Sequence, residues 1–497
     1  MVMQPKQVSG QKVSVRQVAQ PLPVPDHLTK VWQTISARAQ RESPQQPHWL
    51  MERSQKAWQT LANSGFPTTR NEEWKYTSVR SIVAGDGQTV TPFASCPIAA
   101  RSVLPADTIA RIESLPATAV VVFVDGVYSR EYSREPRHST GVDVFDLQNA
   151  LLKCPDEVVQ CLKAVDNGLD QLPKPLAHIG LEAKAFQNLA ASMLYSGAFI
   201  RTKPKQLVDD PIYILHVSSS AAVGERLIAS PHIIVNAAPQ SSLTIIEESV
   251  CLAAKDKAAN ADKSQGLFLP VTAICVGASA QMTHINLANE SRNVTRIGAS
   301  YALLGQNAQF HSTVFTCGGS ISRSDFTVMI DGSGAEATLN GLYTAAKNQH
   351  IDHHTAIDHR VPNATSNQLY KGILSDGSRA VFNGKVFVRR HAQQTAAYQS
   401  NKNLLLGRDA EIDTKPQLEI DADDVKCSHG ATVARLTDEE VFYLQSRGID
   451  KNQAEDMLCH AFADDLLDRI PNAYARQRAA SMLEDFFGRA RAEKSSL

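Results

Sequence analysis

The residues best suited to chemistry form the run Cys427-Ser428-His429-Gly430, late in the chain. In an extended strand, side chains two residues apart project from the same face, so the thiol of Cys427 and the imidazole of His429 should point the same way. This pair suits iron, zinc or a metal cluster. Two ligands do not complete a tetrahedral site, so others would come from elsewhere in the chain or from a partner. The competing interpretation is a buried cysteine beside a hydrogen-bonded histidine.

A second concentration of ligating side chains lies at residues 350–359, where the sequence reads HIDHHTAIDH. Its imidazoles and carboxylates are as dense as in a metal-binding tract. Strand geometry divides them between two faces. One face would carry His350, Asp352, His354 and Asp358, and the other His353 and His359. Because each face holds a partial set, we favour a structural role in hydrogen-bond ladders, with metal or cluster chemistry as the alternative.

The segment from Gly377 to Lys385 has the composition of a phosphate-binding loop but not its spacing. Six residues separate Gly377 from Gly384 where four are needed, and Val386 stands where Ser or Thr should bind magnesium. The sequence also lacks Gly-x-Ser-x-Gly, His-Glu-x-x-His and paired redox-cysteine motifs. We therefore expect a chain that is not an enzyme and does not itself hydrolyse nucleotide.

Composition is that of an ordinary globular protein of two or three domains. The 497 residues carry a formal net charge of −1, which gives no electrostatic reason to expect nucleic-acid or membrane binding. The eight cysteines contain no Cys-x-x-Cys pair, as is typical of reduced intracellular thiols. Residues 1–25 are predicted to be a disordered tail, and the location to be the cytoplasm, or the plastid stroma if that tail is a targeting remnant.

The stretch that must position Cys427 and His429 has the texture of short strands. Apolar bursts between residues 369 and 436 are separated by Gly, Asp, Asn or Pro, and the same texture extends back to residue 198. Small-residue corners recur every ~25–40 residues, as in solenoids. They fall at residues 236–238, 277–279, 305–307 and 331–334. We predict a mainly β fold with a parallel β-solenoid core over residues 198–436, in preference to a sandwich, and an exposed loop at 253–265.

Helical segments flank this core. Residues 26–197 are predicted to form a mostly helical domain, with helices near 26–39, 47–63, 146–153 and 181–195, a Pro/Leu-rich connector after residue 153, and a hairpin turn at Asp125-Gly126. Within it, RNEEWKYTSV is interpreted as a surface ion-pair segment pinned by Trp74 and Tyr76. A capping box at Thr437 and Glu440 begins a C-terminal helical domain over residues 437–497.

Several long motifs resemble the SufB/SufD family of the SUF iron–sulfur cluster assembly machinery, in its SufD form. They are RNEEWKYT, VFVDGVYS, YKGIL, VFNGKVFV, NKNLLLG, KPQLEI, DDVKCSHGAT and VFYLQSRGI. SufB-like sequences have a cysteine in the turn before the Leu-Leu-x-Gly strand, and here Asn401 stands near its place. The resemblance therefore points to the partner that completes a cluster site rather than to the chain with the full set of thiolates.

The resemblance implies a right-handed parallel β-helix and a non-catalytic scaffold subunit of a SufB–SufC–SufD complex. His429, with Cys427 beside it, would lie at the SufB–SufD interface and hold transient iron or a nascent cluster, with no cofactor bound tightly by the isolated chain. The C-terminal helices would bind the SufC ATPase, and the chain could form a homodimer when alone. The residues assigned to the partner contact of the C-terminal helices are Phe442, Met457, Phe462 and Leu466.

Three alternatives remain open from the sequence. The chain could be a SufB-like scaffold paralogue, or a purely structural partner that supplies no ligand. It could also be an autonomous carbohydrate-active enzyme, because a β-helix does not by itself fix a function. The last alternative would need aligned acidic groups and aromatic subsites on one face, whereas only 6% of the residues are aromatic.

Overall fold

The computed structural model describes residues 20–42, 47–83, 93–95, 104–136, 141–173, 184–218, 226–252 and 266–495. Residues 1–19 of the predicted disordered tail and the predicted loop at 253–265 lie outside the described residues. The prediction of disorder is wrong for the end of the tail, because Leu22 forms a backbone bridge with Phe66.

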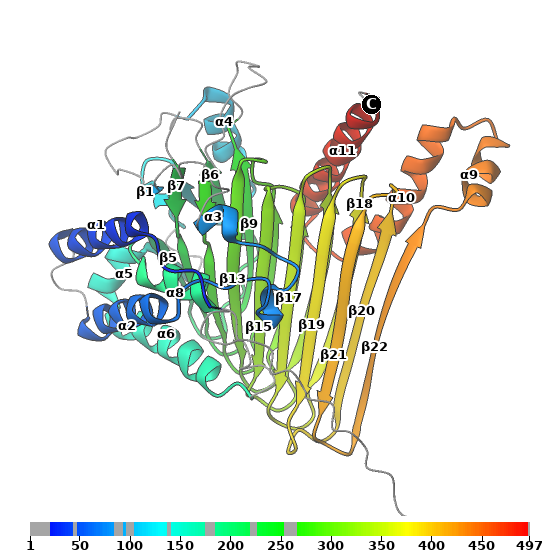
Figure 1. Ribbon diagram of the computed structural model, residues 1–497. Coiled ribbons are helices and arrows are strands. Elements are labelled where there is room, and N and C mark those ends of the chain that lie inside the picture. Colours follow the sequence, from blue (N-terminus) through cyan, green and yellow to red (C-terminus); the bar gives the residue numbers. More distant parts are fainter. Residues whose placement is uncertain are drawn as a thin grey trace, which may run out of the picture.

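Two long sheets form the body of the protein, and successive strands alternate between them (Figure 1). The first sheet has the order β21 (Glu411–Ile420), β19 (Arg379–Val388), β17 (His350–His359), β15 (Ile321–Ile330), β13 (Val294–Leu304), β11 (Val271–Val276), β8 (His232–Ala237), β5 (Gly197–Thr202) and β4 (Val142–Asp146), with β1 (Phe93–Ser95), β7 (Arg226–Ala229) and β10 (Gly266–Phe268) attached. The second has the order β22 (Val425–Arg435), β20 (Thr395–Leu405), β18 (Thr365–Leu374), β16 (Glu336–Ala345), β14 (Gln309–Thr316), β12 (Gln281–Ala288), β9 (Ser242–Cys251), β6 (Ile212–Ser218), β2 (Ala119–Val124) and β3 (Val127–Tyr128). The predicted mainly β fold with a solenoid core is confirmed.

The sheets begin earlier in the chain than the predicted core. Strand β2 pairs in parallel with β6, although it lies within residues 26–197. The N-terminal end of the solenoid is finished by two antiparallel pairs, β2 with β3 and β4 with β5. The first of these is the hairpin predicted at Asp125-Gly126.

Except at the exposed last strands β21 and β22, each sheet is covered on both faces, which explains why its strands read as nearly continuous apolar runs. The interior between the sheets holds one apolar core, which includes Tyr343, Tyr370 and Phe382. A second core joins the outer face of the β2–β22 sheet to α10 (Lys451–Leu467) and α11 (Ala473–Ser495). Two more cores pack N-terminal helices against the other sheet.

The corners between strands are stacked in register, as their small residues predict. Gln240, Ser279 and Asn307 each adopt a left-handed backbone, and each donates its N–H to a carbonyl of the following corner. Gly332 occupies the tightest position, because a Cβ there would overlap the backbone of Gly305 and Gln306. Side chains at such positions would separate neighbouring coils.

We expect Gly332→Ala to destabilise the isolated chain by about 1–3 kcal/mol, since overpacking forces the two coils apart. Urea unfolding monitored by circular dichroism measures this difference. The matched control is Gly430→Ala, because no atom lies within 4 Å of the added Cβ. Equal unfolding midpoints for the two variants would show that the corner tolerates a methyl group.

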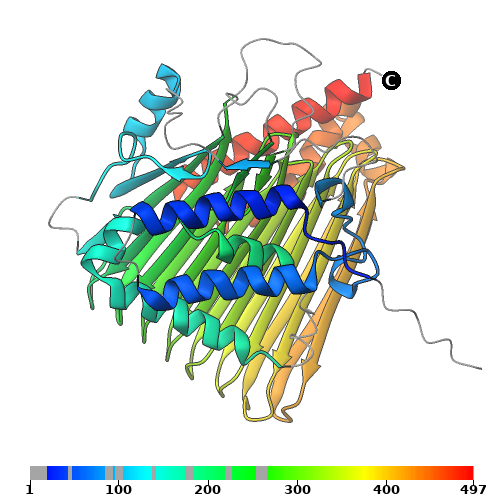
Figure 2. The same cartoon turned by 60° about the vertical axis from the view of Figure 1, so that its left-hand side comes forward.

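The N-terminal helices are α1 (Asp26–Glu42), α2 (His48–Ser64), α3 (Arg80–Val83), α4 (Ala106–Ser114), α5 (Leu147–Lys153), α6 (Pro155–Asp170) and α8 (Ala185–Ser192). Figure 2 shows α1 and α2 lying across the face of a sheet. The predicted connector after residue 153 is wrong, because Pro155 begins α6 at a position where proline is favourable. Its apolar stripe, including Val158 and Leu162, is buried. Within the described ranges, no helix is long and apolar enough to span a bilayer.

Candidate functional site

The C-terminal end of the solenoid is an open pair of strand edges. Strand β22 pairs with β20, and β21 pairs with β19. Both stand last in their sheets, and among the described strands neither has a second neighbour in its sheet (Figure 1). An unpaired edge presents backbone N–H and C=O groups that another chain can bind.

Cys427 and His429 lie on this last strand. Cys427 stands in register with Ala397, and His429 with Gln399, both of which face the interior. Cys427 is half-buried against the interior core, whereas His429 is exposed. Burial raises the pKa of the Cys427 thiol, so a metal or a partner's charge would have to favour the thiolate.

A row of polar side chains inside the solenoid leads to His429. Gln368 donates to the hydroxyl of Thr355, and Gln399 donates to the Gln368 carbonyl at 2.6 Å. The Gln399 Oε1 atom is buried without a hydrogen-bond partner among the described residues. His429 is the next residue in this register, so its imidazole stands where the interior row meets the open end.

The ligand set at this end is incomplete within the chain. No group of three or more His, Cys, Asp or Glu side chains in the described ranges is arranged to hold a metal ion. A metal at Cys427 and His429 would therefore take further ligands from outside these residues. The chemistry of one thiol and one imidazole fits iron or an iron–sulfur cluster as cargo.

The histidine-rich strand β17 is structural, as the division of its faces predicts. On the inner face, His353 lies between the rings of Tyr343 and Tyr370, at centroid distances of 5.3 and 5.4 Å. His359 contacts the Ser366 hydroxyl at 2.8 Å. Burial lowers the pKa of His353 to about 3 and that of His359 to about 4, so both imidazoles are neutral.

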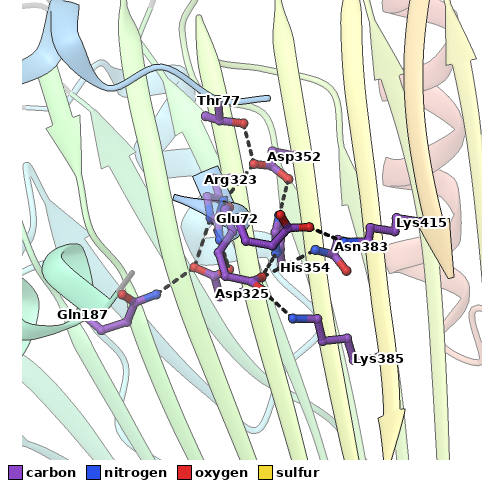
Figure 3. Close-up of polar contacts among 11 residues, drawn as sticks. Glu72, Thr77, Gln187, Arg323, Asp325, Asp352, His354, Asn383, Lys385 and Lys415 are labelled. Carbon is purple, nitrogen blue, oxygen red and sulfur yellow. Dashed lines mark hydrogen bonds and ion pairs between the residues drawn. The ribbon is translucent and has the colours of Figure 1, made fainter. Parts of the chain in front are cut away.

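The outer face of β17 binds the N-terminal segment rather than a metal (Figure 3). Asp352 accepts from Thr77 at 2.6 Å and pairs with Arg323 at 3.0 Å and His354 at 3.0 Å. Farther along, Asp358 pairs with two arginines, Arg360 and Arg389, each at 2.7 Å. The carboxylates of this face are therefore neutralised by the protein itself.

The interpretation of RNEEWKYTSV as a surface segment is wrong for its central residues. Glu73 is 6% exposed, and Trp74 is fully buried beneath the Arg323 guanidinium, 3.9 Å from the ring centroid. Glu73 pairs with Lys385 and, at 3.1 Å, with His354. Burial alone would raise the Glu73 pKa, but His354 and then Lys385 reverse that effect and lower it to about 2. The segment therefore fastens the N-terminal region to the solenoid.

The C-terminal helices place the residues assigned to a partner contact in different environments. Phe442 of α9 (Asp438–Gln445) is 70% exposed and Met457 of α10 is 49% exposed. Phe462 is half-buried against the second core, where Lys371 donates to its carbonyl at 2.8 Å. Leu466 is buried in that core, which corrects its assignment to a partner surface. The predicted capping box at Thr437 is confirmed.

One buried cluster of ion pairs and hydrogen bonds, centred on Glu248, was not predicted from the sequence. Glu248 of β9 is almost fully buried and accepts from Tyr213, from Arg111 of α4, and from Arg478 of α11 at 2.8 Å. It joins α4, which precedes β9 in the chain, and α11, the last helix, to one strand. The sequence contains a sign of this cluster, because two consecutive carboxylates interrupt the otherwise apolar strand LTIIEESV and a buried carboxylate needs partners.

Comparison with known proteins identifies the family of this chain. The model of the SUF system FeS cluster assembly SufBD core domain matches residues 218–462, and that of the SufBD protein N-terminal region matches residues 29–167. The chain therefore belongs to the SufBD family of iron–sulfur cluster assembly proteins.

Among individual relatives, the chain is similar to the iron–sulfur cluster assembly protein SufD of Escherichia coli (strain K12), with 30% identity over 93% of this chain and 97% of the relative. It is 28% identical to the SufBD family protein slr0076 of Synechocystis, over 86% of this chain and 89% of the relative. It is 32% identical to the chloroplastic protein ABCI7 of Arabidopsis thaliana, over 55% of this chain and 56% of the relative.

Proposed function

We propose that the chain is a non-catalytic scaffold subunit that works with SufB and SufC. Its open strand edges would pair with SufB, and iron or a nascent cluster would be held at that junction as cargo. The observation that carries the proposal is the position of His429, exposed on the last strand and beside the half-buried Cys427. An incomplete ligand set at a bare edge fits a site that two chains complete together.

The contact with SufC is proposed for the C-terminal helices. Phe442 and Met457 supply exposed apolar side chains on α9 and α10. Lys371 of β18 pairs with Asp465 of α10 at 2.9 Å, so movement of α10 would reach the solenoid directly. Nucleotide-driven motion of SufC could thereby change the junction that holds the cluster. We place this work in the cytoplasm, or in the plastid stroma if the tail is a targeting remnant.

We expect His429→Ala to reduce cluster formation roughly tenfold or more, on the scale of effects seen when a metal site loses a supporting group. The experiment co-purifies the chain with SufB and SufC, reconstitutes the complex anaerobically with iron and sulfide, and records visible absorption. Cys427→Ala should reduce the absorption as well. The complex itself should survive both changes, because the strand edge is backbone.

The matched control is His391→Ala, which removes an exposed imidazole from a corner instead of from β22. It should leave cluster absorption unchanged. If His429→Ala also leaves it unchanged in an intact complex, the chain is a structural partner that contributes no ligand. If the unaltered chain forms no complex with SufB and SufC, the proposed scaffold role is wrong regardless of the ligands.

A further inference from the structure

A cavity of about 330 Å³ lies between the N-terminal helices and the sheet that contains β8 and β17. Helices α2, α6 and α8 line one side of it, and strands β8, β11, β13, β15, β17 and β19 line the other. Its volume is at the lower end of the range for small-molecule sites. Figure 3 shows part of its wall, where Gln187 donates to Asp325 at 2.7 Å and Asn383 lies on the neighbouring side of Arg323 and His354.

Two buried polar atoms in the lining, His232 Nε2 and Arg53 Nη1, lack the hydrogen-bond partners that burial normally requires among the described residues. His232 is 2% exposed, and its Nδ1 donates to the Ser230 carbonyl at 3.1 Å. Its Nε2 is therefore a bare acceptor, without a partner among the described residues. Burial, followed by the charge of Arg53, lowers the His232 pKa to about 3, so the ring remains neutral.

Arg53 supplies an unsatisfied donor to the same cavity, and Lys184 adds an ammonium group to its lining. Arg53 binds Asp166 through Nε at 2.7 Å and Nη2 at 2.9 Å, while its Nη1 is buried and unpartnered within the described ranges. Lys184 is half-buried in the lining, and burial lowers its pKa although the charges of Asp170 and Asp166 oppose that effect. A buried donor without an acceptor is costly, so Arg53 Nη1, with the Lys184 ammonium in the same lining, is poised for an anionic ligand.

Charge and shape limit what the cavity can accept. Five Lys or Arg and four Asp or Glu side chains line it, an excess of one positive charge. Along α6, Leu162, Val165 and Leu169 form an apolar wall. Lys56 and Asp170 are exposed, so the lining reaches solvent.

We propose that this cavity binds a small organic monoanion with a carboxylate, an apolar body and a hydroxyl donor. The carboxylate accepts from Arg53 Nη1 and Lys184, the apolar body lies along α6, and the hydroxyl donates to His232 Nε2. Each unpartnered group is thereby satisfied by one part of the ligand. The proposal is independent of the scaffold role, because the cavity is lined by other residues than Cys427 and His429.

The test uses 4-hydroxyphenylacetate as the probe and saturation-transfer difference NMR on the isolated full chain. We expect saturable binding with a dissociation constant on the order of 1 mM or tighter. Phenylacetate, which lacks the hydroxyl donor, and 4-hydroxyphenylacetamide, which lacks the charge, should each bind about tenfold more weakly. This ranking is read on the unaltered protein, so it does not depend on the folding of any variant.

Lys184→Met should weaken binding of the probe about tenfold without lowering the thermal unfolding temperature, because burial already disfavours the charge of the ammonium that it removes. Lys30→Met is the control, since Lys30 is exposed on α1 and is not part of the lining. It should leave binding unchanged. Absence of saturable binding, equal affinity for the three compounds, or full affinity in Lys184→Met would each overturn the proposal.

Discussion

Replacing Glu73 by Gln should cost the folded chain about 3–5 kcal/mol, because the ammonium of Lys385 and the imidazole of His354 would lose their shared carboxylate in a buried setting. Both partners are mostly buried, with side chains 14% and 11% exposed. Chemical denaturation of the isolated chain measures the loss. Glu72→Gln is the control, since Glu72 pairs with Lys415 at the surface and should contribute at most about 1 kcal/mol.

At low pH the unaltered chain and Glu73→Gln should have the same free energy of unfolding. The folded-state pKa of Glu73 is about 2, below its ordinary value of 4.5. Its contribution to stability is therefore present above pH 4.5 and is lost as the pH falls towards 2. Denaturation curves at successive pH values should converge across that window. A gap that persists to pH 2 would mean that Glu73 stabilises the fold by something other than its charge.

The second large effect is expected at Glu248, where Gln should destabilise the protein by about 3 kcal/mol. Arg111 and Arg478 would lose their common carboxylate, although each remains partly solvated at 25% and 29% exposure. Because these arginines belong to α4 and α11, both helices should loosen together. Hydrogen exchange measured by mass spectrometry should show faster exchange in residues 106–114 and 473–495, with α2 unchanged.

Glu336→Gln provides the comparison for that experiment, because Glu336 is exposed on β16 of the same sheet. It should leave both stability and exchange near those of the unaltered chain. Faster exchange in only one of the two helices would show that Glu248 anchors that helix alone and does not link them.

The solenoid was predictable because its determinants are local and repeated. Each corner carries its own small residues, and the interval between corners reports the length of a coil. Helix α6 was missed because Pro155 was taken as a loop signal, although proline fits the first turn of a helix. Its buried residues Val158, Cys161, Leu162 and Val165 had the helical spacing that would have revealed it.

Burial of Glu73 and Trp74 could not be deduced from their neighbours in sequence. Arg323 donates to the Glu73 carbonyl from 250 residues away, and Lys385 reaches its carboxylate from 312 residues away. The cavity could not be predicted for the same reason, because Arg53, Lys184 and His232 are far apart in the sequence and come together only in the fold. Cys427 and His429 could be identified from the sequence because they are two residues apart on one strand. Their exposure could not be predicted, because it depends on β22 being the last strand of its sheet.

The two ends of the solenoid differ, and this difference sets the stoichiometry of any assembly built through its strands. The first end finishes in short antiparallel pairs, and the last end leaves β21 and β22 bare. Short edge strands resist pairing, so among the described strands the long edges of the last end are the ones suited to it, and the first neighbour uses them up before a fibre can grow. A second copy and a different subunit must then compete for the same strands. The cellular ratio of the two chains would decide which pair accumulates.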